Sequence, residues 1–191
     1  MKHENISIRR RQVVLAGAVG MAAPAIVAAQ QCAGTPRDAL GPFYKDNAPA
    51  ATNVCASGSG GKEKLLVSGR ILGADCKPLA GALVEVWQAD AKGDYSGVTR
   101  GKADDPGCLL RASLTTDGDG RYFFNTIVPG EYPGRPRHIH YRVSHKGHAT
   151  LVTQLYFDKG VGALAPLVVS TTKDETGMTR AAFEVTLARA A

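Results

Sequence analysis

Short apolar runs separated by turn-forming residues dominate the chain after residue 62. Seven segments combine aliphatic, β-branched and aromatic residues over strand length, with Gly, Pro, Asp or Asn between them. They cover residues 65–72, 82–88, 121–127, 138–144, 150–157, 164–170 and 182–187. No helical period of apolar residues stands out past residue 30. The pattern therefore predicts an all-β fold, an antiparallel β-sandwich of about seven or more strands.

The segment before these runs is irregular. Residues 30–62 contain Pro36, Pro42, Pro49 and a glycine-serine run over 57–61, all of which interrupt regular structure. We expect an irregular N-terminal arm over residues 30–62 and one catalytic domain over 63–191, since 191 residues suffice for a single core. The Asp-Gly repeat at 117–120 is read as a turn, because no glutamate follows at a spacing that would complete a calcium loop.

The first 29 residues have the character of a targeting segment. Paired arginines at Arg9, Arg10 and Arg11 precede a mildly apolar stretch over 13–29 that is diluted by glycine and proline. This is similar to a twin-arginine export signal, with cleavage expected before Gln30. A membrane anchor is the alternative, but the stretch is at the short end of the spanning range. We expect an exported protein, periplasmic or extracellular, without a stable membrane anchor after cleavage.

Charge and cysteine content narrow the function classes. Of the formal charge of +6, half comes from residues 1–29, and the remainder of the chain carries 19 basic and 16 acidic side chains. That balance gives no basic stripe for nucleic acid. The four cysteines, Cys32, Cys55, Cys76 and Cys108, have no CxxC spacing, so two disulfides are expected in an oxidising compartment. Three pairings are compatible with the sequence.

The candidate chemistry centres on His138 and His140. In a strand, residues two apart project from the same face, so both imidazoles can reach one metal while Ile139 points into the opposite layer. The turn over 129–134 places Tyr132 just upstream, and a phenol beside two imidazoles suits iron(III), a hard cation that prefers anionic oxygen. His145 and His148 lie beyond the strand and are expected to be solvated. Trp87 and Tyr122 lie in apolar strands and are expected in the core.

Several longer motifs resemble those of the intradiol ring-cleaving dioxygenase family. A segment over 81–95 ends in Tyr95, a second over 116–132 ends in Tyr132, and residues 134–140 contain Arg135 with the two histidines. Shorter matches lie at 41–44 and 153–157. Together they span roughly residues 38–158 in the family's order.

The resemblance implies one non-haem Fe(III) per chain, bound by Tyr95, Tyr132, His138 and His140. It implies that Tyr132 leaves the metal as a phenol and acts as base, and that Arg135 stabilises negative charge on the ring. Gln154 is expected to be a polar pocket residue and Tyr44 to line the substrate entrance, although a surface ion pair for Arg135, an ordinary strand position for Gln154 and a packed aromatic for Tyr44 are the alternatives. The implied reaction uses O2 to open a small aromatic diol between its hydroxyl-bearing carbons, which yields a cis,cis-muconate-type diacid. No helical dimerisation linker precedes residue 41, and a homo-oligomer is left open.

Two other classes share part of this pattern. Copper-zinc superoxide dismutase combines HxH with a disulfide-bonded sandwich, but only four histidines follow residue 29, too few for its bimetallic ligand set. Transthyretin-like binding modules share the sandwich layout without a metal, and residues 67–82 resemble them. Such a module has no need of two tyrosines and two histidines at ligand spacing. The ring substituents of the substrate are not determined by the sequence.

Overall fold

The computed structural model describes residues 31–55, 63–95, 108–131 and 134–190. Within these ranges the chain forms strands β1 to β9 and one short 3-10 helix, η1. The elements are β1 (Lys64–Gly73), β2 (Leu83–Gln88), β3 (Arg111–Thr115), β4 (Arg121–Ile127), β5 (His138–Ser144), β6 (Leu151–Tyr156), η1 (Ala165–Leu167), β7 (Thr171–Lys173), β8 (Thr179–Ala182) and β9 (Val185–Leu187). No helix in the described part of the chain is long and apolar enough to cross a bilayer.

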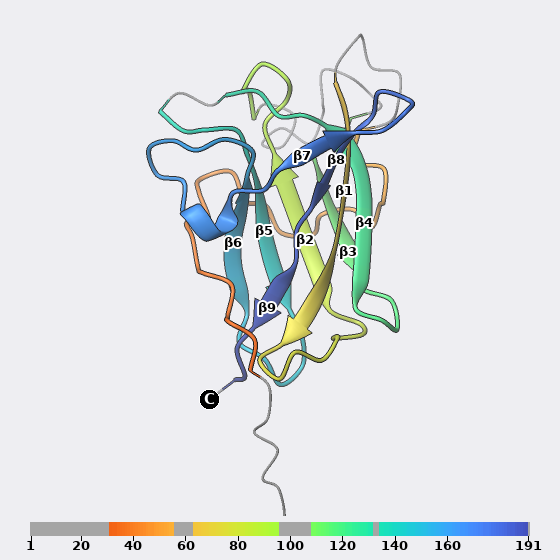
Figure 1. Cartoon of the computed structure of the whole chain (residues 1–191), viewed down its shortest axis with the longest axis vertical. Coiled ribbons are helices and arrows are strands. Elements are labelled where there is room, and N and C mark those ends of the chain that lie inside the picture. The colour runs from red at the N-terminus through yellow and green to blue at the C-terminus, as the bar shows by residue number, and fades with distance from the viewer. Residues whose placement is uncertain (1–30, 56–62, 96–107, 132–133, 191) are drawn as a thin grey trace, which may run out of the picture.

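Two sheets pack face to face, which confirms the predicted β-sandwich (Figure 1). One sheet has the order β4-β1-β8-β7, with β9 also paired to β1, and the other has the order β3-β2-β5-β6. Most pairings are antiparallel, but β8 and β9 both run parallel to β1. The C-terminal strands therefore close the first sheet along a strand far away in the sequence, a feature that the sequence did not predict.

The predicted strands differ from the structure mainly near the C-terminus. The strand expected over 164–170 is wrong, because residues 165–167 form η1, with a proline in its first turn and Leu167 buried. The segment expected as one strand over 182–187 is divided between the end of β8 and all of β9. Strands β3 and β7 were not predicted, since β3 is short and half polar and β7 has no buried residue.

Side chains along β5 alternate between the core and the candidate site. Ile139, Tyr141 and Val143 are completely buried between the sheets. His138 and His140 project from the other face of the same strand, as the period of two requires. The candidate ligands therefore lie on the outer face of the four-stranded sheet, outside the main core.

The arm, residues 31–55, covers this outer face. Its main chain bonds to β9 through Thr35 N and Thr186 O at 3.1 Å, then to β6 through Asp38 N and Val152 O at 2.9 Å, and later to β3 through Ser113 N and Pro49 O at 2.9 Å. Disulfides Cys32–Cys76 and Cys55–Cys108 attach the two ends of the arm to the domain. The structure thus selects one of the three pairings, and the arm is held at both ends.

The sequence predicts a turn before β4 and two solvated histidines after β5. The Asp117 carboxylate accepts hydrogen bonds from the backbone N–H groups of Asp119 (2.9 Å) and Arg121 (2.8 Å), which confirms the predicted turn before β4. His145 and His148 are partly exposed. Their Nδ1 atoms lie 3.1 Å apart, and His145 Nε2 lies 3.2 Å from Ala80 O in the β1–β2 connection.

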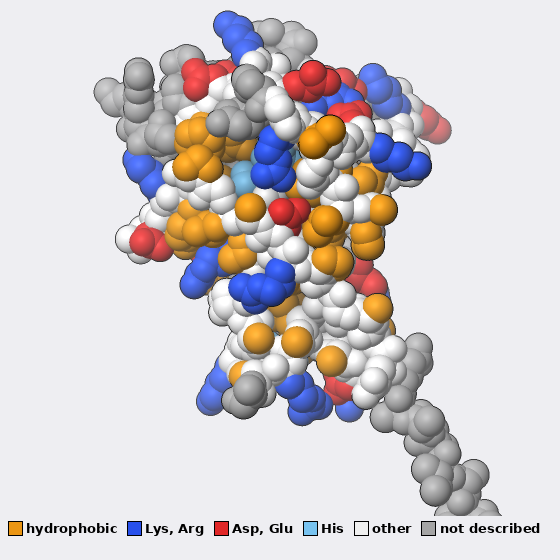
Figure 2. Space-filling model, turned by 90° about the vertical axis from the view of Figure 1, so that its left-hand side faces the viewer, with side chains coloured by type: hydrophobic (Ala, Val, Ile, Leu, Met, Phe, Trp, Pro, Cys, Tyr) orange, Lys and Arg blue, Asp and Glu red, His pale blue; other side chains and the backbone are white. Residues whose placement is uncertain are grey.

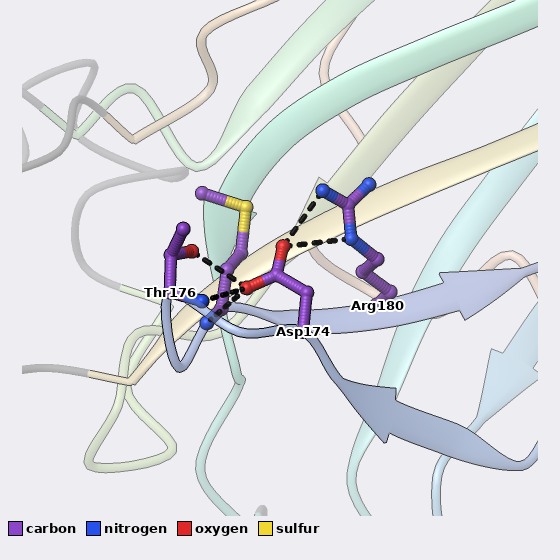
Figure 3. A network of polar contacts seen from close by, with 4 residues as sticks. Asp174, Thr176 and Arg180 are labelled. Atoms are coloured by element: carbon purple, nitrogen blue, oxygen red, sulfur yellow. Dashed lines mark hydrogen bonds and ion pairs between the residues drawn. The ribbon is translucent and has the colours of Figure 1, made fainter.

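The β7–β8 hairpin is closed by Asp174 (Figure 3). Its carboxylate accepts hydrogen bonds from the Thr176 hydroxyl (2.6 Å) and the Met178 backbone N–H (3.1 Å), and it pairs with the Arg180 guanidinium. The bonds from Thr176 and Arg180 lower the pKa of Asp174 to about 2. A short hairpin without buried residues in β7 is thereby held by a carboxylate that stays ionised at neutral pH.

The packing of β1 against the β8–β9 connection makes Gly69 a critical residue. A Cβ at this position would lie 1.8 Å from the Phe183 carbonyl oxygen. We predict that Gly69→Ala lowers the free energy of unfolding by roughly 3 kcal/mol, because backbone atoms must separate to admit the methyl group. Chemical denaturation of the metal-free protein measures this effect.

Gly118→Ala is the matched control for Gly69→Ala. It adds the same methyl group where nothing lies within 4 Å of the new Cβ. Its expected effect is within about 0.5 kcal/mol of zero. Equal losses of stability in the two variants would show that close packing at Gly69 is not the cause.

Candidate metal centre

The two imidazoles of β5 are arranged to share one ion. His138 Nδ1 lies 2.8 Å from the Pro136 carbonyl oxygen, so this nitrogen carries the proton and Nε2 has a free lone pair. His138 Nε2 lies 3.2 Å from His140 Nε2. Two ring nitrogens directed at the same point, with the tautomer of one set by a backbone carbonyl, are typical of histidine metal ligands.

A tight turn brings Tyr95 to the same point. The Asp90 carboxylate accepts hydrogen bonds from the backbone N–H groups of Lys92 (2.7 Å) and Asp94 (3.0 Å), and Gly93 has a φ of 85°. The chain therefore reverses just after β2, and Tyr95 Oη lies 3.2 Å from His138 Nε2. Tyr95 is buried, with 4% of its surface exposed.

Tyr132 lies outside the described residues, and its predicted role as ligand and base stays a prediction. The segment just before it is described. Gly130 N donates to Asp90 O at 2.8 Å, and a Cβ on Gly130 would lie 2.5 Å from both Ala91 O and Gly93 N. The chain leading to Tyr132 is thus packed directly against the turn that positions Tyr95.

Both histidines are held in the neutral form. Burial, together with the nearby His138 and Arg135, lowers the pKa of His140 to about 3. Burial also lowers the pKa of His138, with Arg135 acting in the same direction. Neutral imidazoles are the form that binds a metal ion, so no proton has to be removed from either ring at neutral pH.

The donor set fits iron(III). In the described ranges no carboxylate or thiol joins the two histidines in a group of three that could hold a metal. The oxygen that does approach them belongs to the phenol of Tyr95. A phenol that loses its proton to a bound cation supplies the anionic oxygen that a hard, trivalent ion prefers.

Aromatic side chains fix the orientation of these ligands. Trp87 stacks on His140 with ring centroids 4.8 Å apart and planes 1° apart, and Phe43 stacks on Tyr95 at 4.2 Å. Gly41 has a φ of 72°, and a Cβ there would lie 3.0 Å from His140 Cε1. The arm therefore lies against the imidazole so closely that a side chain at residue 41 would collide with it.

Arg135 and Gln154 lie together beside the histidines. Arg135 Nη2 donates to Gln154 Oε1 at 2.9 Å and also to the hydroxyl of Tyr156. In the β5–β6 register His140 pairs with Gln154, and His138 pairs with Tyr156. Sequence reasoning missed Tyr156, although the same period of two that joins the histidines places it on the face of Gln154.

Tyr44 packs against Trp87. Its ring centroid lies 5.0 Å from that of Trp87, and its hydroxyl donates to Glu85 Oε1 at 3.0 Å. Glu85 is also paired with Arg142. Burial and the contact with Glu85 raise the pKa of Tyr44 to about 12. Tyr44 therefore contacts the site through Trp87, and direct contact with a substrate stays a prediction.

The surface beside β6 combines the features expected around such a site. Figure 2 shows a histidine side chain reaching the surface there, with hydrophobic side chains on one side and a Lys or Arg side chain on the other. A groove of about 1190 Å³ lies elsewhere, between β1, β3, β4 and the arm, and contains the half-exposed Phe123. None of the candidate site residues lines that groove, so ligand chemistry locates the site and cavity size does not.

Comparisons with known proteins agree with this assignment. The family model described as Dioxygenase matches residues 39–185. The hydroxyquinol 1,2-dioxygenase of Rhizobium sp. (strain MTP-10005) is 38% identical over 61% of this chain and 45% of its own length. Catechol 1,2-dioxygenase 2 of Acinetobacter lwoffii is 37% identical over 65% of this chain and 52% of its own length. The chain thus spans about half the length of these curated relatives.

Solved structures show the same relationship. The dioxygenase domain of a dioxygenase and carbohydrate-binding protein fusion from Streptomyces sp. SirexAA-E superposes with a TM-score of 0.71 at 34% identity. The match covers 83% of this chain and 100% of that domain. A solved structure of similar extent therefore exists for the sandwich and its arm.

The depressed pKa of His140 predicts how the metal-free protein responds to acid. Between the pKa of about 3 in the folded state and about 6.5 in the unfolded chain, the unfolded state binds more protons, so stability falls as the pH is lowered through this range. We expect His140 to contribute a loss of about 2 kcal/mol between pH 6.5 and pH 5. Denaturation of metal-free protein at both pH values measures it. The variant His140→Gln should lose less stability between these two pH values. A loss equal to that of the wild type would contradict the assignment of this pH dependence to His140.

Proposed function

Because this chain belongs to the intradiol dioxygenase family, we propose that it is a non-haem Fe(III) enzyme that opens a catechol-type ring between its two hydroxyl-bearing carbons with O2. The observation that carries the proposal is the convergence of one phenol and two neutral imidazoles, Tyr95, His138 and His140, within 3.2 Å contacts. The relatives are a hydroxyquinol and a catechol dioxygenase, which favours catechols and hydroxyquinols as the substrate class.

Four side chains would hold the iron: Tyr95, His138 and His140, with Tyr132 as the fourth. Two phenolates and two neutral imidazoles leave one positive charge on an Fe(III) centre, which favours an anionic diol as the next ligand. When bound, the ion would supply the electronic coupling that makes an aromatic diolate reactive toward O2. The remaining work of binding, proton transfer and charge compensation falls to the protein.

The proton balance assigns a role to Tyr132. A diol that binds as a dianion must lose two protons. A tyrosinate that leaves the metal can accept one of them, and a hydroxide that the diol displaces, which leaves as water, would accept the other. Tyr95 is held by the turn at residues 90–94 and by stacking on Phe43, so it is the phenol suited to remain bound. Tyr132 is then the phenol that takes the proton at its Oη.

Arg135 provides a fixed positive charge for the ring. Its guanidinium lies close enough to lower the pKa values of both His138 and His140, so its charge reaches the metal centre. Gln154 holds one end of this guanidinium through its Oε1. Negative charge that develops on the substrate ring during attack by O2 would be stabilised there. The product is a cis,cis-muconate-type diacid that contains both oxygen atoms.

The colour and iron content of the purified protein test this function. We expect one iron per chain, a broad visible band from tyrosinate-to-iron charge transfer, and a shift of that band on anaerobic addition of catechol. On admission of O2, catechol should be converted to a diacid that carries two labelled oxygen atoms from ¹⁸O2. A protein that stays colourless after iron reconstitution would favour a metal-free, transthyretin-like binding module instead.

Variants of single ligands separate this outcome from general misfolding. Tyr95→Phe and His138→Gln should each lower iron affinity or turnover by at least about 100-fold, because each removes one metal ligand. Phe123→Tyr is the matched control, since Phe123 is 54% exposed and lies in the distant groove. Retention of iron and colour in both ligand variants would contradict the proposed site.

We also propose that residues 1–29 direct export by the twin-arginine route. The support is the arginine cluster at residues 9–11 ahead of an apolar stretch, and the two disulfides of the domain suit an oxidising compartment. Replacing Arg9, Arg10 and Arg11 together by Lys keeps the charge and should strand the protein in the cytoplasm. Fractionation of cells that have this pathway measures it, and equal export of both forms would contradict the proposal.

A further inference from the structure

A chain of hydrogen bonds joins the arm to Arg135. The Tyr156 hydroxyl donates to Asp38 Oδ2 at 2.8 Å and accepts a hydrogen bond from Arg135 Nη2. Arg135 Nη2 also donates to Gln154 Oε1, and Gln154 Nε2 donates to Ala39 O at 2.7 Å. Both routes that hold the guanidinium therefore end on neighbouring residues of the arm.

We propose that Tyr156 and Asp38 are positioning residues that hold the Arg135 guanidinium against the substrate ring, so that the docked arm determines where this charge lies. The inference rests on the proposed dioxygenase function and extends it to two residues that are not among the proposed metal ligands. In this proposal the arm positions Arg135 in addition to covering the site.

Tyr156 is suited to this role and not to metal binding. Burial raises its pKa, and the hydrogen bond to Asp38 raises it further, so the hydroxyl keeps its proton. That proton is directed at Asp38, which leaves an oxygen lone pair for Arg135. Tyr95, by contrast, directs its oxygen at His138 Nε2. Two phenols thus lie near the histidines with opposite tasks.

Asp38 is placed rigidly enough to act as the anchor. Its backbone N donates to Val152 O at 2.9 Å, which attaches Asp38 itself to β6. The Cys32–Cys76 disulfide attaches the chain just upstream. The carboxylate is half-buried, so its hydrogen bond with Tyr156 is partly shielded from water.

The guanidinium itself retains a donor that this network does not use. Arg135 Nε is buried and has no hydrogen-bond partner in the part of the chain that the structure describes. A buried N–H without a partner is costly unless something else completes it. The bonds from Nη2 to Tyr156 and Gln154 therefore leave the Nε donor unused.

The expected consequence is a loss that falls on kcat. If Arg135 stabilises charge only as it develops on the ring, displacing it weakens the transition state more than the bound substrate. We expect Tyr156→Phe to lower kcat by about 10- to 100-fold, with KM changed less than about threefold. Asp38→Asn should give a smaller loss of the same kind, because its amide oxygen can still accept from Tyr156.

The experiment uses the iron-loaded full chain, and first establishes that the wild type cleaves catechol. Iron content, the tyrosinate band of the resting protein and thermal stability are measured for each variant. They should match the wild type, since no metal ligand is altered. Absence of ring cleavage in the wild type would sink the proposed function, whereas normal wild-type activity with unaffected variants would sink only the role of Tyr156 and Asp38.

Coupling to Arg135 distinguishes positioning from a general effect. If Tyr156 acts through Arg135, then Tyr156→Phe should cost little more in an Arg135→Gln background, where the charge is already absent. Losses that multiply in the double variant would overturn the proposal, because they would show that Tyr156 acts independently of the guanidinium.

Thr153→Val is the matched control for loosening of the arm. It removes a hydrogen bond between β6 and the arm, at Pro36 O, from a fully buried side chain of nearly equal size. Among the described residues, the Thr153 side chain makes no hydrogen bond with Arg135, Gln154 or Tyr156, so kcat should stay close to the wild-type value. A loss as large as that of Tyr156→Phe would show that arm docking, and not placement of the guanidinium, limits the reaction.

Discussion

The alternation of side chains along β5 is the constraint on which the rest of this structure depends. Ile139, Tyr141 and Val143 complete the core between the sheets, and this burial decides which face His138 and His140 must occupy. A shift of one residue in register would move apolar side chains out of the core and both imidazoles into it. The stability of the sandwich and the geometry of the candidate metal centre are therefore set by the same pairing of β5 with β2 and β6.

A site on the outer face of a sheet would be open to water unless something covered it, and here the arm does so. Gly41 lies against His140, Phe43 stacks on Tyr95, and Asp38 reaches the network around Arg135. The disulfides fix the arm at both ends. Because irregular chain has few internal hydrogen bonds, such attachment reduces the conformational entropy that ordering the arm would otherwise cost.

The groups around the histidines differ in charge, and each charge state has a structural cause. Burial keeps both imidazoles neutral, Tyr95 offers an oxygen that can become anionic, and Arg135 contributes one positive charge held by neutral partners. Tyr156 stays protonated because Asp38 accepts its hydrogen bond. Tyr95 and Tyr156 therefore have different roles, because Tyr95 faces the lone pair of an imidazole and Tyr156 faces a carboxylate.

Sequence alone determined the features that depend on neighbouring residues. The period of two identified β1, β2, β4, β5 and β6, placed His138 and His140 on one face, and sent Ile139 into the core. The motifs ending in Tyr95 and Tyr132 indicate the family from the sequence alone. Local signals were weak for β3 and β7 and misleading at 164–170, where Pro166 lies within the helical turn η1.

Tertiary structure decided everything that joins distant segments. The disulfide pairing, the parallel alignment of β8 and β9 with β1, and the contact of Asp38 with Tyr156 span long stretches of chain. No short-range pattern encodes such contacts, because each is the outcome of packing two sheets and one arm into the same volume at once. The sequence therefore predicts which side chains can bind a metal. Only the folded sandwich brings Tyr95 to within 3.2 Å of His138 and places Arg135 beside Gln154.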